Sequence, residues 1–156
     1  MICRKIAILA EKRIAAYCAA NQIDDWLSIR TVSQLETVLR GESACGLLFF
    51  PLFLHQLGKR AGDVLSICLS LGKKLAILEY RTPERNLDYP AYAACCLLEM
   101  TGSHFEAYRD FMQSGGLEGL LFRARQIPRL REVMLGGAAS FVCLTPVGSP
   151  DMDKTR

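Results

Sequence analysis

Residues 46–78 read GLLFFPLFLHQLGKRAGDVLSICLSLGKKLAIL, and this stretch decides the fold. An apolar run at 46–50, ended by Pro51, predicts a buried strand, because proline cannot donate to a sheet ladder. Apolar residues recur at helical spacing from 63 to 71, and Gly72 marks the end of that helix. A second apolar run at 75–78 predicts another strand. Strand, helix and strand in this order are typical of parallel pairing through a crossover.

The residues before this stretch continue the same alternation. A short apolar run at 5–9 predicts a strand, and the spacing of apolar residues predicts a helix over 11–21. A further strand is expected at 26–29, followed by a helix that begins at a capping box, Ser33 to Glu36, and ends at Gly41. The predicted fold class is therefore α/β: three layers around a mostly parallel, Rossmann-like sheet of four or five strands.

The second half of the chain is predicted to be mostly helical. Asp88 and Pro90 open a helix that runs to Met100, apolar on most sides and therefore expected to be buried. A second capping box at 103–106 starts a helix to about 113, residues 114–116 break it, and a helix interrupted at Pro128 is expected over 117–135. The last strand is predicted at 141–144. Residues 1–145 form one predicted domain, and 146–156 a flexible tail.

The composition indicates a globular protein. Of the 156 residues, 51% are hydrophobic and 22% are charged, which is unlike a disordered chain, and the net charge of +3 is mild. No secretory signal is visible, and the most apolar stretch, 45–54, is about half the length needed to span a bilayer. We therefore expect a cytoplasmic protein that is not inserted in a membrane.

The cysteines indicate free thiols in a reducing compartment rather than a disulfide framework or a metal site. Their number is odd, most lie in apolar runs, and the chain has only two histidines, His55 and His104. No Cys-x-x-Cys pair occurs, so we expect no metal. The glycine-rich dinucleotide motif, the P-loop and the Gly-x-Ser-x-Gly elbow are also absent, so no cofactor and no catalytic residue is predicted.

The loops at the carboxyl ends of the predicted strands are the expected ligand-binding positions, since ligands of parallel α/β sheets bind there. Several of their polar residues are basic and would suit a phosphate-bearing ligand. Loops of this kind are also polar simply because they face water, and both interpretations stay open. The loop at 80–85 also carries polar residues at a strand end, Arg81, Glu84 and Arg85. The candidates for ligand or phosphate binding are Glu11, Lys12, Arg13, His55, Gln56, Lys59 and Arg60.

A dense basic cluster lies near the C-terminal end of the predicted helical half. Such a cluster could follow a nucleic-acid backbone, although a solvated arginine-rich face is equally familiar. The candidates for nucleic-acid binding are Arg123, Arg125, Arg129 and Arg131.

Residues 30–79 resemble the catalytic domain of serine recombinases, the resolvase and invertase family. The resemblance rests on a Leu-rich helix at 34–41, an apolar strand at 47–50, and then Leu57, Gly58 and Asp63, with Lys59 standing for an arginine of the family. It implies a resolvase-like fold and a role in DNA recombination.

This chain lacks the active-site residues that serine recombinases have at the matching positions. The family places a nucleophilic serine just after the first strand, where this chain has 10–13, Ala-Glu-Lys-Arg. The family's Asp-Arg pair is replaced by His55 and Gln56. Without a hydroxyl nucleophile no covalent DNA-phosphate intermediate can form, so the resemblance implies a non-catalytic relative.

Three hypotheses follow. The leading one is a non-catalytic resolvase-like domain that binds DNA or a recombinase partner. The first alternative is a Rossmann-like or flavodoxin-like protein or enzyme that binds a phosphorylated small molecule at the strand ends. The second alternative is a homo-oligomeric interaction module that packs through the apolar helix at 91–100.

Overall fold

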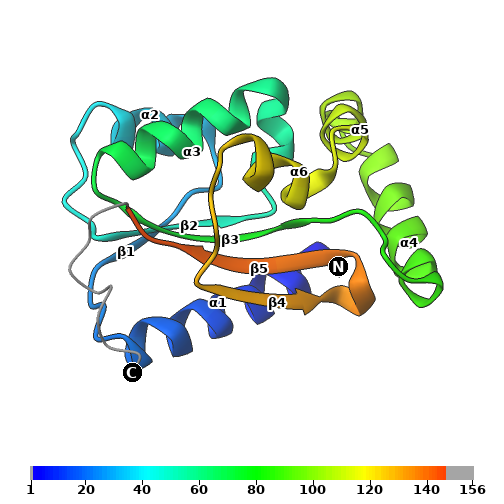
Figure 1. The fold of residues 1–156 in the computed structure, drawn as a ribbon, viewed down its shortest axis with the longest axis horizontal. Helices are drawn as coiled ribbons and strands as arrows, with labels where there is room; N and C mark the ends of the chain where they lie inside the picture. The colour runs from blue at the N-terminus through cyan, green and yellow to red at the C-terminus, as the bar shows by residue number, and fades with distance from the viewer. Residues whose placement is uncertain (1, 147–156) are drawn as a thin grey trace.

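A five-stranded mixed sheet forms the centre of the structure (Figure 1). The computed structural model describes the backbone of residues 2–146 and the side chains of residues 10–146. The strands are β1 (Trp26–Ser28), β2 (Leu47–Pro51), β3 (Lys74–Tyr80), β4 (Leu130–Met134) and β5 (Ala139–Leu144). Their order across the sheet is β1-β2-β3-β5-β4. The first three strands are parallel, and β5 runs antiparallel to both of its neighbours.

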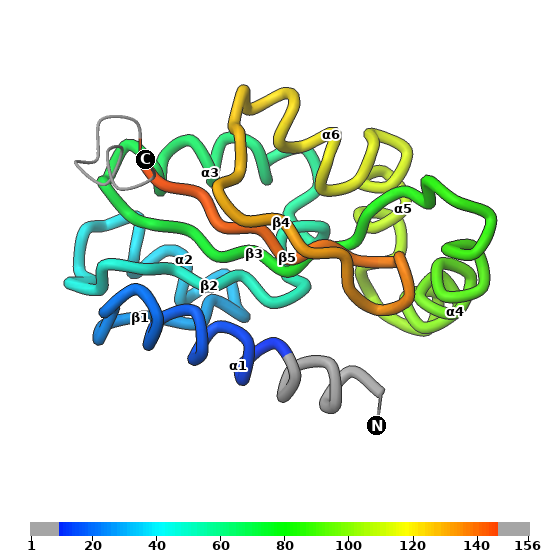
Figure 2. Tube along the Cα trace, turned by 60° about the horizontal axis from the view of Figure 1, so that its bottom comes forward, coloured from blue at the N-terminus to red at the C-terminus, as the bar shows by residue number. Residues whose placement is uncertain are grey.

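Helices cover both faces of this sheet, which confirms the predicted three layers (Figures 1 and 2). Helix α1 (Ile2–Ala20) lies on one face, and α2 (Val32–Leu39), α3 (Ala61–Ser70) and α6 (Gly116–Arg123) lie on the other. Helices α4 (Tyr89–Met100) and α5 (Phe105–Gln113) lie beyond the carboxyl end of β3. Three short 3-10 segments complete the chain: η1 (Leu54–Arg60), η2 (Asn86–Asp88) and η3 (Leu135–Gly137).

Strand β2 shows why the apolar run at 46–50 forms a central strand. Its side chains alternate between the two faces of the sheet: Leu48 and Phe50 join the core under α2 and α3, whereas Leu47 and Phe49 join the core under α1. All four side chains are fully or almost fully buried from solvent. A strand covered on both faces needs apolar residues at every position, and this produces an unbroken run instead of an alternating one.

The strand predicted at 5–9 is wrong, because these residues belong to α1. The helical stripe predicted for the following residues extends backward through them: Ala10, Ile14 and Cys18, spaced by four residues, are buried against the sheet. A five-residue apolar run has no periodicity that separates a buried strand from a buried helix segment.

The C-terminal part of the sheet is also corrected by the structure. The strand predicted at 141–144 exists as β5, but it is antiparallel to β3, so the sheet is parallel only among β1, β2 and β3. Residues 130–134, predicted as helix, form the edge strand β4. Its exposed residues Arg131 and Val133 alternate with half-buried ones, which is the two-residue period of a strand with one face to solvent.

Neither predicted capping box is found where it was predicted. Thr31 caps α2 in place of Ser33, and Gln34 supplies the return bond. No side chain caps α5.

Helix α4 is not buried as predicted. Leu97 and Met100 are 65% and 59% exposed, because α4 lies beyond the sheet and packs on its neighbours along one side only. The homo-oligomer hypothesis for this helix stays a prediction. Of the predicted tail at 146–156, residues 147–156 lie outside the described part of the chain.

Replacing Ile14 by alanine tests the position of α1 on the sheet. Ile14 is fully buried, so Ile14→Ala should lower the free energy of unfolding by about 2–5 kcal/mol, as large-to-small changes in cores do. Urea denaturation measures the change. Lys12→Ala, at an exposed position of the same helix, should change it by less than about 0.5 kcal/mol. Equal effects of the two variants would show that α1 does not pack as described.

Candidate functional site

The carboxyl ends of β2 and β3 lie side by side and lead into polar segments. After β2 the chain turns into η1, which carries His55 and is bent at Gly58, where φ is +54°. After β3 it continues into a loop that begins with Arg81. Because β2 and β3 are parallel, both segments emerge at the same edge of the sheet, where the chain then inserts α4, α5 and α6.

A buried pair of His55 and Glu79 joins these two segments. The imidazole Nδ1 lies 2.9 Å from Glu79 Oε1, and the His55 backbone N–H donates to Glu79 Oε2 over 3.2 Å. The backbone N–H of Tyr80 also donates to Glu79. His55 is 2% exposed and Glu79 is 0% exposed, so each depends on the other to offset its loss of water.

A second carboxylate, from α4, lies on the other side of the imidazole. Glu99 Oε2 is 3.7 Å from His55 Nε2, and Tyr80 donates its hydroxyl proton to Glu99 Oε1 over 2.6 Å. Burial alone would lower the pKa of His55, but the carboxylates of Glu79 and Glu99 raise it above its ordinary value. Burial and the bond to Glu99 raise the pKa of Tyr80, so this phenol stays protonated.

This arrangement makes His55 an anchor rather than a general base. Both ring nitrogens face carboxylates, the ring is enclosed by Tyr80, Tyr108 and Phe111, and no nitrogen is left to meet a substrate. Among the side chains that the structure describes, no group of three His, Cys, Asp or Glu residues could hold a metal ion.

A pocket of about 420 Å³ lies between η1, α3, α5 and α6, and we call it the α3–α5–α6 pocket. Its polar side chains include two basic residues and one acidic residue, while phenylalanine and leucine supply apolar wall. It is lined by Gly58, Lys59, Gly62, Asp110, Phe111, Ser114, Leu120 and Arg123.

The charges in the α3–α5–α6 pocket favour an anion. Lys59 is exposed and makes no ion pair or hydrogen bond within the described residues, and Arg123 donates to the carbonyl oxygen of Ser114. Gly62 brings the first turn of α3 to the pocket. No side chain caps that end of the helix, although the Ala61 N–H donates to the carbonyl oxygen of Gly58 and Asp63 places one negative charge in the same turn. Uncapped N–H groups at a helix start carry partial positive charge, which adds to that of the two cations.

A second cavity, of about 260 Å³, lies between α4 and α5 and is mainly apolar. Its walls include Cys96 and Tyr108, whose sulfur and hydroxyl are 3.2 Å apart, and burial followed by this contact raises the pKa of Tyr108. Arg109 is the charged residue at its rim.

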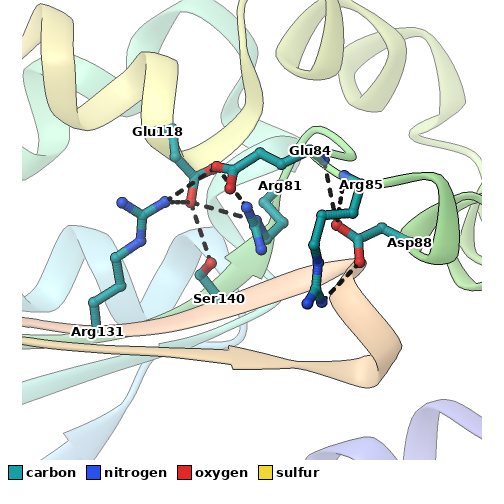
Figure 3. Close-up of polar contacts among 7 residues, drawn as sticks. All are labelled: Arg81, Glu84, Arg85, Asp88, Glu118, Arg131 and Ser140. Atoms are coloured by element: carbon teal, nitrogen blue, oxygen red, sulfur yellow. Dashed lines mark hydrogen bonds and ion pairs between the residues drawn. The ribbon is translucent and has the colours of Figure 1, made fainter.

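A cluster of charged and polar side chains lies where β3, β4, β5 and α6 meet (Figure 3). Arg81 is buried at the end of β3, Glu118 comes from α6, Arg131 from β4, and Ser140 from β5. Arg131 and Ser140 both donate to Glu118 Oε1, over 2.7 and 3.1 Å. The loop after β3 contributes Glu84, and beside it Arg85 bonds the buried Asp88. Burial would raise the pKa of Asp88, but the hydrogen bonds from Arg85 lower it below its ordinary value.

The predicted site residues of the N-terminal segment do not lie with those of η1. Glu11, Lys12 and Arg13 were expected in a turn after a first strand, but they occupy the middle of α1, on the opposite face of the sheet from α3 and α6. Glu11 pairs with Arg30, and Arg13 pairs with Glu132 of β4.

The predicted candidates of η1 do lie close together at the carboxyl edge of β2. His55 is buried with Glu79, while the amide of Gln56 donates to the carbonyl oxygen of Leu52. Lys59 lines the α3–α5–α6 pocket, and Arg60 is exposed beside it at the start of α3.

The four arginines predicted to bind nucleic acid lie in different surroundings. Arg123 lines the α3–α5–α6 pocket, and Arg131 is held by Glu118 and Glu84. Arg125 lies in the turn after α6 with φ of +53°, and Arg129 begins the approach to β4.

Several polar residues of this region were not predicted. Glu79, Glu99, Asp110 and Glu118 come from β3, α4, α5 and α6, and their contacts depend on how those elements pack. Arg81, in the loop after β3, is one of the strand-end residues that the sequence had indicated. One signal was present in the sequence: Glu79 and Arg81 continue an apolar strand, and a charge at a buried strand end requires a partner.

Comparison with known proteins identifies no family for this chain. No protein-family model and no curated protein matches the chain. A similar solved structure is an O-methyltransferase family protein from Burkholderia thailandensis, with 16% sequence identity and a TM-score of 0.45. The match covers 71% of this chain and 34% of that one, so this chain spans about a third of that protein's length.

The resemblance to serine recombinases is wrong, and with it the hypothesis of DNA binding and DNA recombination. Its first strand and the turn at 10–13 are part of α1. No recombinase family model matches the chain. Separately, no helix within residues 2–146 is long and apolar enough to cross a membrane.

The buried His55 pair predicts a loss of stability at alkaline pH. A histidine whose pKa is raised by folding stabilises the folded state below its unfolded pKa of about 6.5, and this contribution disappears as the pH rises through the folded value. The free energy of unfolding should therefore fall more between pH 6.5 and pH 9 in the wild type than in His55→Gln. Guanidinium titrations at both pH values measure this difference, and equal slopes would contradict the charged pair.

Proposed function

We propose that this protein binds a small anionic molecule in the α3–α5–α6 pocket, through a phosphate or carboxylate group. The observation that supports this proposal is the convergence of Lys59, Arg123 and the uncapped start of α3 on one cavity. Lys59 has no anionic partner within the described residues, so its charge is available to a ligand. Cations and helix N-termini are the groups that proteins use to bind phosphate and carboxylate.

The remaining walls restrict the kind of molecule that fits. Asp110 can accept a hydrogen bond from a hydroxyl or amino group of the ligand, and Phe111 and Leu120 offer apolar surface to its carbon skeleton. A volume of about 420 Å³ falls within the usual range for pockets that hold small molecules. These features favour a compact metabolite with one anionic end, a hydrogen-bond donor and an apolar part.

The proposal is one of binding rather than catalysis. His55 does not line the pocket, and its two nitrogens face the carboxylates of Glu79 and Glu99. The pocket is formed by segments that follow β2 and β3 and by the helices inserted after them, which agrees with the expectation that ligands bind beyond the carboxyl ends of parallel strands.

Replacing Lys59 by alanine tests this function. Thermal unfolding with inorganic phosphate and a panel of phosphorylated and carboxylated metabolites identifies the ligand class, because a ligand of the folded state raises Tm. Calorimetric titration of the strongest hit should then show a loss of about ten- to one hundred-fold in affinity for Lys59→Ala, the range for one charge-assisted hydrogen bond. The unliganded Tm should stay unchanged, because Lys59 is exposed and unpaired.

Lys12→Ala serves as the matched control. It also removes one exposed lysine charge, but from α1 on the other face of the sheet. The proposal fails if Lys59→Ala and Lys12→Ala weaken binding equally, or if no anion in the panel stabilises the wild-type protein.

A further inference from the structure

Arg81 is a buried cation whose hydrogen-bonding edge is not filled. It follows β3 directly and is 2% exposed. Its backbone is fixed, because its N–H donates to Ala138 over 3.0 Å and it forms a bridge with Gly116 at the start of α6. The side chain is buried as well, and a buried guanidinium needs anionic or hydrogen-bonding partners to offset its loss of water.

Two carboxylates reach Arg81, but neither satisfies it. Glu84 Oε1 lies 2.5 Å from Nη2, and Glu118 Oε1 lies 3.7 Å from Nε. Even so, Nε and Nη2 make no hydrogen bond of acceptable geometry, and neither does the buried Oε2 of Glu118. Nε and Nη2 form the edge of a guanidinium that binds two oxygens of one carboxylate in parallel. In Arg81 this edge is divided between two carboxylates that come from different segments.

The two carboxylates are held very differently (Figure 3). Glu118 is on α6 and accepts hydrogen bonds from Arg131 and Ser140, so it is a fixed part of the cluster. The side chain of Glu84 extends from the loop after β3 and is 61% exposed. Within the described residues its ion pairs are with Arg81 and, at 3.7 Å, with Arg131. Rotation of Glu84 into solvent would therefore uncover the edge of Arg81 without disturbing Glu118.

We propose that Glu84 occupies the place of a ligand carboxylate, and that a small organic acid binds Arg81 and Arg131 when Glu84 swings out. The charges support a monoanion: Arg81 and Arg131 carry two positive charges, Glu118 carries one negative charge, and one further negative charge makes the cluster neutral. Arg85 and Asp88 do not alter this balance, because they pair with each other over 3.1 Å.

This carboxylate site is separate from the α3–α5–α6 pocket. The pocket uses Lys59 and Arg123, and the carboxylate site uses Arg81 and Arg131. Helix α6 contributes to both, through Arg123 and Glu118. The two proposals can therefore fail independently.

Chemical rescue of Glu84→Ala tests the site. This variant should have a lower Tm than the wild type, because Arg81 loses its nearest carboxylate. Sodium acetate should restore Tm, whereas sodium chloride at equal ionic strength should not. Acetate should bind Glu84→Ala about tenfold or more tightly than the wild type, where the tethered Glu84 competes at high effective concentration. The ¹⁵N–¹H signal of Arg81 Nε should shift in a saturable manner during the titration.

Matched variants make the outcome decisive. Glu106→Ala removes another exposed glutamate, in the first turn of α5, and should show no gain specific to acetate. Rescue should persist in Glu84→Ala/Lys59→Ala and disappear in Glu84→Ala/Arg131→Ala. The proposal is overturned if acetate and chloride act alike on Glu84→Ala, if Glu106→Ala responds equally, or if phosphate binds as tightly as acetate. In the wild type, excess acetate should shift the Arg81 Nε signal weakly, and a complete lack of shift would also count against it.

Discussion

Neutralising the buried carboxylate of Glu79 is the constraint on which the carboxyl edge of the sheet depends. Glu79 is 0% exposed, and an isolated charge in such a place would cost far more than folding can supply. Its partners are the imidazole and backbone N–H of His55 and the backbone N–H of Tyr80. The two groups of His55 reach it only if η1 lies against β3. The same interaction that satisfies Glu79 therefore fixes the position of η1, of Lys59, and of the beginning of α3.

The short helix α6 connects this edge with the rest of the sheet. It begins at Gly116, where φ is +58° and where a Cβ atom would lie 3.0 Å from the carbonyl oxygen of Tyr80. Glycine at this position lets the backbone of α6 approach the end of β3 closely. In this position α6 places Arg123 in the α3–α5–α6 pocket and Glu118 beside Arg81.

The sequence predicted the elements that have a clear pattern of apolar residues along their length. The run at 46–50 is covered on both faces, and the helix at 63–71 presents a clear apolar stripe, so both were predicted correctly. Residues 5–9 were not, because a short apolar run fits a helix as well as a strand. The edge strand at 130–134 was missed because it alternates half-buried and exposed residues, and the direction of β5 is set by pairings with β3 that no local pattern records.

The candidate site was predictable only in part, for a similar reason. Lys59 and Arg123 were both singled out as basic residues, but they are 64 positions apart in the sequence, and their convergence depends on the packing of α5 and α6 against α3. Glu118 was missed because it belongs to no ligand-binding cluster in the sequence, and Arg81 was indicated only as one of several polar residues at the strand ends. A charged residue at the end of a fully apolar strand, such as Glu79, is the sequence feature that could have indicated this edge.

The position of β5 between β3 and β4 has a consequence for how the chain folds. Pairs such as Leu75 with Leu144 and Ala76 with Cys143 join residues separated by more than sixty positions, whereas β1, β2 and β3 pair with their successors along the chain. Contacts between distant residues close long loops and form late. The parallel half can thus assemble during synthesis, while the edge of β3 remains open until the last residues of the sheet emerge, and in that interval it is the surface that a chaperone would need to shield.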